Sequence, residues 1–271
     1  MSVETTTRIG EMFERCRAGR RKAFIAYLTA GDPNTEQTAP LVLALERGGA
    51  DLIELGVPFS DPIADGPVIQ RASDRALRAG VKLSRILEMV REIRRHSEIP
   101  LLLFSYLNPL MRYGFERLAK DAANAGADAV LLTDLCVEEA EEPVRKLREQ
   151  NLDTVFLAAP TSTEQRLRLV AEHSSGFIYL VSRTGVTGEQ ASLSEALEPL
   201  AKRMRAFTDL PLAAGFGIST PEQALEAASV ADGVVVGSAI VRQIEKHMAD
   251  ANIAAELEAF TRRFTAPLRA Q

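Results

Sequence analysis

Short apolar segments alternate with longer amphipathic segments along the chain. Most of the short segments lack polar alternation, which is typical of parallel β-strands that are buried on both faces. The pattern therefore predicts eight strands, at residues 23–29, 52–55, 101–105, 129–133, 154–158, 177–181, 212–214 and 233–236.

The longer segments have the apolar spacing of amphipathic helices. They lie at residues 38–47, 83–96, 115–125, 137–150, 164–172, 193–207 and 221–228. Thr220 and Pro221 illustrate a helix start, with an N-cap residue followed by proline at the first helical position. Two extra helices are predicted, one before the first strand at residues 8–18 and one inside the second crossover at residues 68–78.

A weak internal repeat supports a single architecture. Gly-Ala-Asp stands at residues 49–51 and 126–128, and Ala-Asp-Gly at residues 231–233, each time where a helix ends and a strand begins. Eight such βα units predict an α/β protein, a (β/α)₈ TIM barrel with extra helices, as one domain over residues 1–271. A doubly wound open sheet is the alternative, but the turn after the first strand lacks the GxGxxG pattern common in that fold.

Composition excludes several classes of protein. The net charge of −5 argues against a nucleic-acid-binding surface, which usually needs a basic excess. Two distant cysteines, Cys16 and Cys136, do not make a disulfide framework. The sequence shows no secretory signal and no apolar stretch of membrane-spanning length. We therefore expect a cytoplasmic protein without a nucleic-acid or membrane partner.

Two carboxylates stand where a barrel enzyme places its chemistry, at the carboxyl ends of strands and in the loops that follow. Glu54 lies near the end of the second predicted strand, and Asp65 lies in the loop after it, together with Asp61. A desolvated carboxylate there has a raised pKa, which suits proton transfer near neutral pH. The alternative for Glu54 is a structural carboxylate bound to an arginine or a backbone N–H.

Glycine-rich turns follow strands six, seven and eight. The turns at residues 215–217 and 237–238 match the position of the usual phosphate site of such barrels, where backbone N–H groups and a helix N-terminus bind the anion. The turn at residues 183–188 is predicted to be a lid anchored by Arg183, with a plain surface loop as the alternative.

Other catalytic groups are poorly placed. The three histidines, His96, His173 and His247, lie in or beside predicted helices, and no lysine stands at the carboxyl end of a predicted strand. A metal centre and a Schiff-base lysine are thus disfavoured. The sequence favours carboxylate acid–base catalysis with no metal and no cofactor in this chain.

Several motifs resemble those of the tryptophan synthase alpha chain family, in order and over nearly the whole chain. They are AYLTAGDP (residues 26–33), IELGVPFSDPIADGP (53–67), YLNP (106–109), YLVSRTGVTG (179–188), AGFGIS (214–219) and GVVVGSAIV (233–241). The resemblance implies retro-aldol cleavage of indole-3-glycerol phosphate to indole and glyceraldehyde 3-phosphate.

The resemblance also implies roles for individual residues. Glu54 is expected to be the acid–base glutamate and Asp65 the aspartate on the indole side. Thr187 is counted among the substrate-binding residues, and the predicted lid motion would let it hydrogen-bond Asp65 once the lid is closed. The indole pocket is expected to comprise Phe24, Tyr179 and Phe216. The phosphate site is expected to comprise Gly188, Gly217, Gly237 and Ser238.

The resemblance implies a partner, a pyridoxal-phosphate-dependent beta chain in an α₂β₂ assembly. Its expected contact residues are Pro58, Asp61, Pro62, Asn108 and Pro109. Cys136 stands where the family pattern usually has proline, which puts the rigidity of that loop in doubt. Three alternatives stay open: a stand-alone lyase, another phosphate-binding barrel isomerase, and a non-catalytic barrel that activates a partner, the last disfavoured by the presence of both carboxylates.

Overall fold

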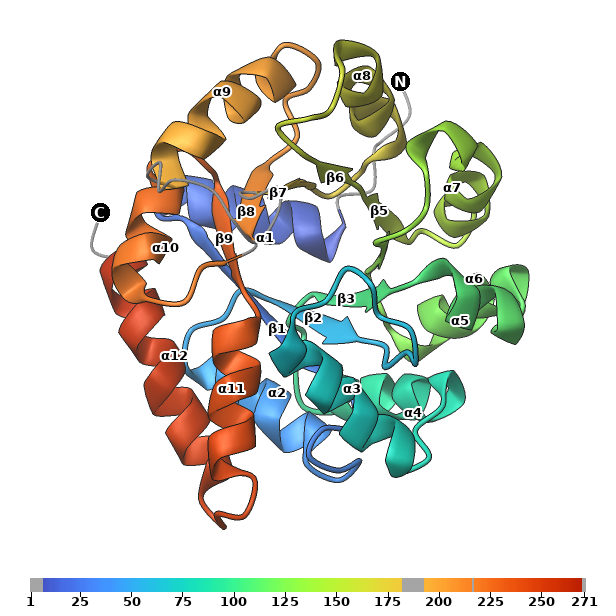
Figure 1. Ribbon diagram of the computed structural model, residues 1–271, viewed down its shortest axis with the longest axis vertical. Helices are drawn as coiled ribbons and strands as arrows, with labels where there is room; N and C mark the ends of the chain where they lie inside the picture. The colour runs from blue at the N-terminus through green and yellow to red at the C-terminus, as the bar shows by residue number, and fades with distance from the viewer. Residues whose placement is uncertain (1–6, 182–192, 216, 270–271) are drawn as a thin grey trace.

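The computed structural model describes residues 7–181, 193–215 and 217–269. Within these residues the strands form one parallel sheet, and helices surround it (Figure 1). The strands are β1 (Ala23–Thr29), β2 (Leu52–Gly56), β3 (Leu101–Ser105), β4 (Ala129–Leu132), β5 (Asp153–Val155), β6 (Leu157–Ala158), β7 (Ile178–Val181), β8 (Leu212–Gly215) and β9 (Gly233–Val236).

The sheet closes into a barrel. Its strand order is β5-β4-β3-β2-β1-β9-β8-β7-β6, so β5 and β6 lie at its two ends. Only Phe156 separates these two strands along the chain, and its carbonyl accepts a hydrogen bond from Tyr179 N at 3.1 Å. The predicted strand at residues 154–158 is therefore divided at Phe156, and the predicted TIM-barrel architecture is confirmed.

Helices cover the outside of the barrel and one of its ends. They are α1 (Arg8–Ala18), α2 (Thr38–Arg47), α3 (Pro67–Arg78), α4 (Leu83–Arg94), α5 (Leu107–Tyr113), α6 (Phe115–Ala125), α7 (Glu141–Arg148), α8 (Glu164–His173), α9 (Leu193–Arg205), α10 (Pro221–Ala228), α11 (Ser238–His247) and α12 (Ile253–Arg269), with a 3₁₀ turn η1 (Val137–Glu139). None of these described helices combines the length and the apolar character that a membrane crossing needs.

Most predicted helices are confirmed, and the structure differs from the prediction in three places. The segment predicted as one helix over residues 137–150 begins as η1, and α7 starts only at Glu141, with Pro143 in its first turn. Proline is tolerated there because the first turn has no intrahelical partner for its N–H. Helices α5 and α12 were not predicted.

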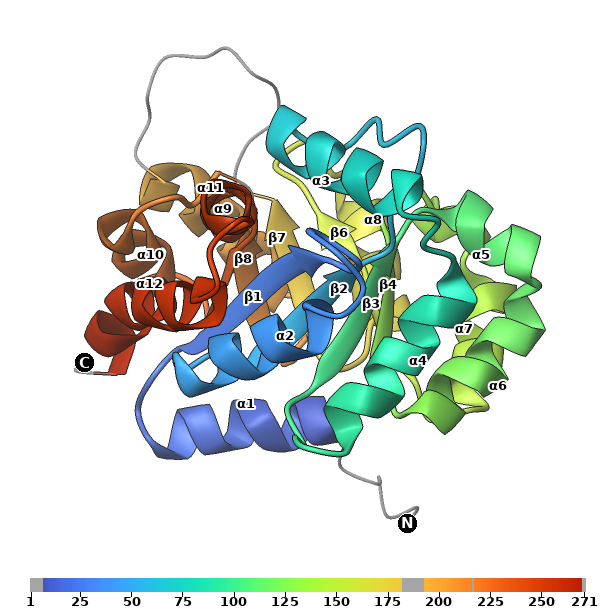
Figure 2. The same cartoon turned by 90° about the horizontal axis from the view of Figure 1, so that it is seen from below.

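Side chains that alternate along the strands form two separate apolar clusters. The inner cluster fills the barrel and includes Ile25, Tyr27 and Phe104. Helix α1 closes this cluster from below with Phe13 and Met12, and Figure 2 shows α1 under the strands, at the end opposite α3. The outer cluster lies between the strands and the surrounding helices. The closed lower end leaves the carboxyl ends of the strands as the place for a site.

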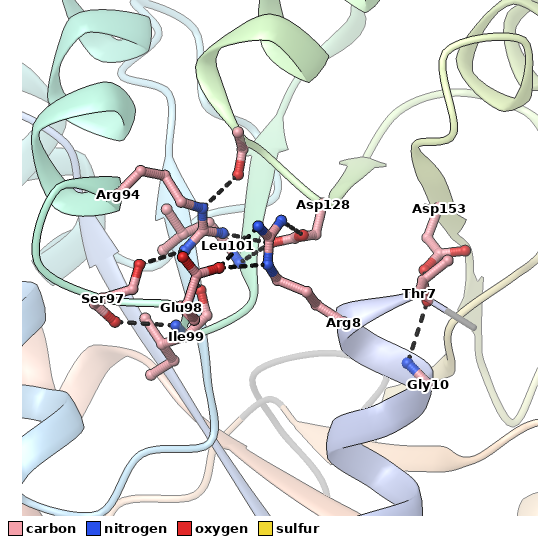
Figure 3. A network of polar contacts seen from close by, with 11 residues as sticks. Thr7, Arg8, Gly10, Arg94, Ser97, Glu98, Ile99, Leu101, Asp128 and Asp153 are labelled. Atoms are coloured by element: carbon pink, nitrogen blue, oxygen red, sulfur yellow. Dashed lines mark hydrogen bonds and ion pairs between the residues drawn. The ribbon is translucent and has the colours of Figure 1, made fainter. Parts of the chain in front are cut away.

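The repeated aspartates anchor the lower end of the barrel. Each carboxylate accepts a hydrogen bond from a backbone N–H at the start of the preceding strand, from its first or second residue, and pairs with an arginine. The aspartates are Asp51, Asp128 and Asp232, their backbone donors are Phe24, Leu101 and Leu212, and their arginines are Arg21, Arg94 and Arg205. Figure 3 shows the Asp128 example, where Arg8 of α1 also binds the carboxylate at 3.0 Å. The repeated aspartates thus fix the positions at which neighbouring strands begin. They lie at the opposite end of the barrel from the carboxyl ends of the strands.

Candidate functional site

Glu54 projects from β2 with no compensating partner in the described residues. Its Cα lies in register between Tyr27 of β1 and Leu102 of β3. The residue is 1% exposed, and its Oε1 atom is buried without a hydrogen bond to any described residue. Burial alone raises the pKa of Glu54 to about 8. A structural carboxylate would be held by an arginine or backbone N–H groups, and the described residues supply neither to Oε1.

Tyr27 caps the barrel interior beside Glu54. A Cβ atom added to Gly56 would lie 2.1 Å from the Tyr27 hydroxyl, so only glycine leaves room for the ring at this position. The ring packs edge-on against Phe104, with centroids 5.3 Å apart. Burial and the nearby carboxylates of Asp65 and Glu54 raise the pKa of Tyr27, which keeps its hydroxyl neutral. Tyr27 and Glu54 pair in register on adjacent strands, and the loop with Asp65 follows β2, so the three groups lie toward the carboxyl ends of these strands.

Asp65 lies in the loop between β2 and α3. Its backbone N–H donates to Pro62 O at 3.0 Å, and the neighbouring Ala64 N–H donates to the Tyr106 hydroxyl at 2.9 Å. Gln70 donates its side-chain amide to Asp65 O at 2.8 Å. Burial raises the pKa of Asp65 to about 6, while a hydrogen bond with Tyr106 opposes the shift.

The two carboxylates therefore differ in protonation at neutral pH. Glu54, with a pKa of about 8, is mainly protonated, and Asp65, with a pKa of about 6, is mainly ionised. Two carboxyl groups whose environments separate their pKa values in this way can serve as an acid and an anion in one reaction.

Phe24 lies outside the barrel, so its predicted place in an indole pocket is wrong. It belongs to the outer cluster and packs against Phe264 of α12, with ring centroids 5.9 Å apart. Side chains alternate along a strand, and the inward residues of β1 are Ala23, Ile25 and Tyr27. Tyr27 is the aromatic residue of β1 at the mouth. It lies two residues after the inward-facing Ile25, and this alternation along the strand would have predicted its inward position.

Tyr179 lies on the inner face of β7, as the indole-pocket prediction requires. It belongs to the inner cluster, and a Cβ atom added to Gly215 would lie 2.1 Å from its hydroxyl. Tyr27 and Tyr179 thus each need a glycine, on β2 and β8 respectively, to fit across the end of the barrel. The predicted residues Arg183, Thr187, Gly188 and Phe216 lie outside the described residues.

The predicted phosphate residues Gly237 and Ser238 form the start of α11. Gly237 is the N-cap, and Ser238 is the first helical residue. Free backbone N–H groups at a helix N-terminus favour an anion. A Cβ atom on Gly237 would meet Tyr27 Cβ at 3.4 Å, an ordinary contact, so the start of α11 lies beside the Tyr27 side chain. Gly217 is exposed at the end of β8, with a φ of 89° that favours glycine.

The predicted partner residues flank the mouth on the β2 and β3 side. Phe59 packs on Tyr106 with ring centroids 5.2 Å apart, which joins the loop of Asp61 to the start of α5. Apolar side chains are exposed on both segments, with Ile63 at 87% and Met111 at 59%. Of the predicted contact residues, Asp61 and Asn108 are exposed, Pro62 and Pro109 are half-buried, and Pro58 is buried, so Pro58 does not lie on the surface.

The loop with Cys136 is held by side chains. Asp134 accepts a hydrogen bond from Leu107 N at 2.7 Å, which ties this loop to the start of α5. The exposed Cys136 thiol lies 3.0 Å from a Glu138 carboxylate oxygen and 3.3 Å from the Arg166 guanidinium. These contacts restrain the loop where the family pattern has proline.

Comparison with known proteins points to one family. The sequence profile described as tryptophan synthase alpha chain matches residues 13–268. The tryptophan synthase alpha chain of Solibacter usitatus is 62% identical over 256 residues, which is 94% of this chain and 96% of that protein. The alpha chain of Geotalea uraniireducens is 52% identical over 244 residues, covering 90% and 91% of the two chains.

Solved structures agree with the sequence relatives. Tryptophan synthase subunit alpha from Legionella pneumophila superposes with a TM-score of 0.89 at 37% identity, covering 98% of this chain and 99% of that chain. A chain of tryptophan synthase from M. tuberculosis, in an aminoacrylate-bound form, gives 0.87 at 36% identity, covering 97% and 99%. Together with a family match over nearly the whole sequence, these likenesses show that the chain belongs to the tryptophan synthase alpha chain family.

Proposed function

We propose that this chain is a carbon–carbon lyase that cleaves indole-3-glycerol phosphate to indole and glyceraldehyde 3-phosphate, with Glu54 and Asp65 as its catalytic carboxylates. Family membership supports the reaction. The observation that carries the residue assignment is the desolvation of Glu54, which is buried, with no hydrogen bond to Oε1 from any described residue, on the strand that leads into the loop with Asp65.

The protonation states suit the order of proton transfers. A protonated Glu54 can deliver its proton to indole C3, which gives an indolenine with positive charge at the ring nitrogen. An ionised Asp65 stabilises that charge. The glycerol hydroxyl then returns a proton to the Glu54 carboxylate as the C3–glycerol bond breaks, and the bonding electrons restore the indole ring. No proton or electron is consumed overall, so the carboxylates act as a shuttle.

The phosphate of the substrate is proposed to bind at the N-terminus of α11, on the backbone N–H groups near Gly237 and the Ser238 hydroxyl, with Gly188 and Gly217 completing the site. Tyr27 and Tyr179, with Phe216, would contact the apolar indole ring. Tyr27 is added to the predicted pocket residues because it lies on the inner face where Phe24 was expected.

We propose that the reaction needs no metal and no cofactor of this chain, and that the chain works in the cytoplasm with a tryptophan synthase beta chain in an α₂β₂ complex. Pyridoxal phosphate would belong to that partner. The exposed Ile63 and Met111, beside Asp61 and Asn108, give the mouth of the barrel an apolar surface with a polar rim, which is typical of a docking surface. A stand-alone lyase remains the second candidate.

The test is an assay of the purified chain for indole formed from indole-3-glycerol phosphate, with and without a beta chain. We expect indole in both cases and faster formation with the partner. Absence of indole under both conditions would overturn the proposed reaction, and an unaltered rate with verified complex would support the stand-alone lyase.

A further inference from the structure

Asp65 depends for its position on α3. The helix begins at Pro67, two residues after Asp65. Gln70, in the first turn, donates its side-chain amide to Asp65 O at 2.8 Å. A displacement of α3 along the barrel would therefore displace the aspartate with it.

Apolar packing of α3 is weak. Its buried residues are only Ala72, Ser73 and Ala76, with Val68 and Ile69 partly buried. The next helix along the chain, α4, has the same length but buries six residues, all of them large aliphatic residues or methionine. Burial stabilises roughly in proportion to apolar area, so small side chains hold α3 less firmly.

An ion-pair network supplies the missing restraint. Arg71 binds Glu245 through Nε and Nη2 at 2.8 and 2.7 Å, and Arg75 donates to Glu245 at 2.8 Å. Arg75 also binds Asp32 through two hydrogen bonds, of 2.6 and 3.0 Å. Asp32 follows β1 and is 1% exposed, and Glu245 lies in the last turns of α11. The two arginines of α3 are thereby fixed to a strand end and to a second helix.

The arginines of this network each bind one carboxylate through two nitrogen atoms, which restrains them more than an ordinary surface ion pair does. Isolated exposed pairs contribute little to stability, but bidentate arginine–carboxylate pairs define direction as well as distance. The pKa of Glu245 is lowered to about 2, mainly by the hydrogen bond from Arg71, so its carboxylate is ionised at any working pH. The network therefore links α3 to α11, which contact each other (Figure 1).

We infer that Glu245, acting through Arg71 and Arg75, is a positioning residue for Asp65. The inference rests on the proposed function. Helix α11 offers its N-terminus, at Ser238, to the phosphate of the substrate, and its other end holds α3 through Glu245. One helix therefore sets the position of the aspartate relative to the bound phosphate, although Glu245 itself touches neither the substrate nor Asp65.

The test compares Glu245→Gln with Glu258→Gln as a matched control. Glu258 of α12 also pairs with two arginines, Arg47 and Arg262. The Arg71–Glu245 and Arg47–Glu258 pairs have similar side-chain exposures, 53% and 24% against 54% and 20%. We expect similar small losses of Tm in both variants. Only Glu245→Gln should lower kcat, on the order of tenfold for a slightly misplaced group, with KM little changed.

Hydrogen exchange gives a readout that does not depend on turnover. The backbone amides of residues 61–66 should exchange faster in Glu245→Gln than in the wild type, and at the wild-type rate in Glu258→Gln. Gln70→Ala removes the link between α3 and Asp65 but leaves the ion pairs in place. It should lower kcat in the same way, and the double variant should be no slower than the slower single variant, because both changes act on one path.

Wild-type kcat and wild-type exchange of residues 61–66 in Glu245→Gln would overturn the inference, and so would an equal loss of kcat in Glu258→Gln. If the wild type forms no indole, the proposed function fails instead. The exchange rates would then still decide whether Glu245 holds the Asp65 loop in place.

Discussion

At the scale of single residues, the chemistry rests on what surrounds two carboxyl groups. Glu54 lies in the barrel wall where nothing described stabilises its charge, and Asp65 lies in a loop where Tyr106 partly offsets its burial. The same type of functional group therefore has a pKa of about 8 in one place and about 6 in the other. The proposed acid and the proposed anion are thus distinguished mainly by their environments, since the ordinary pKa values of the two groups, 4.5 and 3.8, are close.

The pH dependence of kcat/KM should follow from these values. Activity should fall below about pH 6, because Asp65 loses its charge, and above about pH 8, because Glu54 loses its proton. A bell-shaped profile with its maximum between these limits is expected from steady-state rates in buffers of constant ionic strength. A profile that stays flat from pH 5 to pH 9 contradicts the assignment of both groups.

Stability should also depend on pH through Glu54. Its folded-state pKa is raised above the unfolded value, so its contribution is fully present below the unfolded pKa of 4.5 and is lost as the pH rises through about 8. The free energy of unfolding should fall by at most about 1.4 kcal/mol per pH unit within this window because of this group. Glu54→Gln should remove that part of the slope in denaturant titrations. Parallel curves for variant and wild type would show that the pKa is not raised.

At the scale of secondary-structure elements, the alternation of apolar and amphipathic segments was enough to predict the barrel. The ranges of α1, α2, α6 and α10 agree with the structure because each lies between clear turn signals. Helix α12 follows the eighth βα unit, where the alternation gives no reason to expect another helix. The division of β5 from β6 at Phe156 is a matter of hydrogen-bond geometry that an apolar run does not reveal.

The site was predictable to the extent that position along a strand determines it. Glu54 and the start of α11 follow from reading strand ends. Phe24 was misplaced because the resemblance to a family says little about which face of β1 a residue occupies, whereas period-two alternation from Ile25 points to Tyr27. The ion pairs of Glu245 with α3 join elements far apart in sequence, and no local pattern marks them.

Substitution at the N-terminus of α11 tests the proposed phosphate site. Gly237→Asp should weaken the affinity for glycerol 3-phosphate greatly, because it adds a negative charge at the N-terminus where the phosphate is proposed to bind. Gly237→Ala is the matched control, since a Cβ atom there makes only an ordinary contact of 3.4 Å with Tyr27. Isothermal titration of both folded variants measures the effect. Equal affinities in Gly237→Asp and Gly237→Ala would place the phosphate elsewhere.

At the scale of the whole molecule, the barrel is asymmetric between its two ends. Helix α1 and the Arg–Asp pairs close the lower end, while the upper end holds Glu54 and Asp65 together with the exposed Ile63 and Met111. Indole is small and apolar, so an enzyme that releases it gains from passing it directly to a partner docked on the upper end.

A beta chain should accordingly stimulate indole formation. Docking would order the loop shared by Asp61 and Asp65, which shifts the population of Asp65 toward its working position. Asp61→Ala should reduce the stimulation more than the basal rate, measured at partner concentrations where binding is verified. If Asp61→Ala lowered the basal and the stimulated rates by the same factor, Asp61 would have no specific role in docking.

The most direct measurement of the central claim is the turnover of indole-3-glycerol phosphate by Glu54→Gln beside the wild type. The amide is nearly isosteric with the protonated acid, so the fold should survive, as near-ultraviolet circular dichroism can verify. We expect kcat to fall by roughly 10²–10⁴, the usual scale for an acid–base group. A folded Glu54→Gln enzyme that forms indole at close to the wild-type rate would contradict the account.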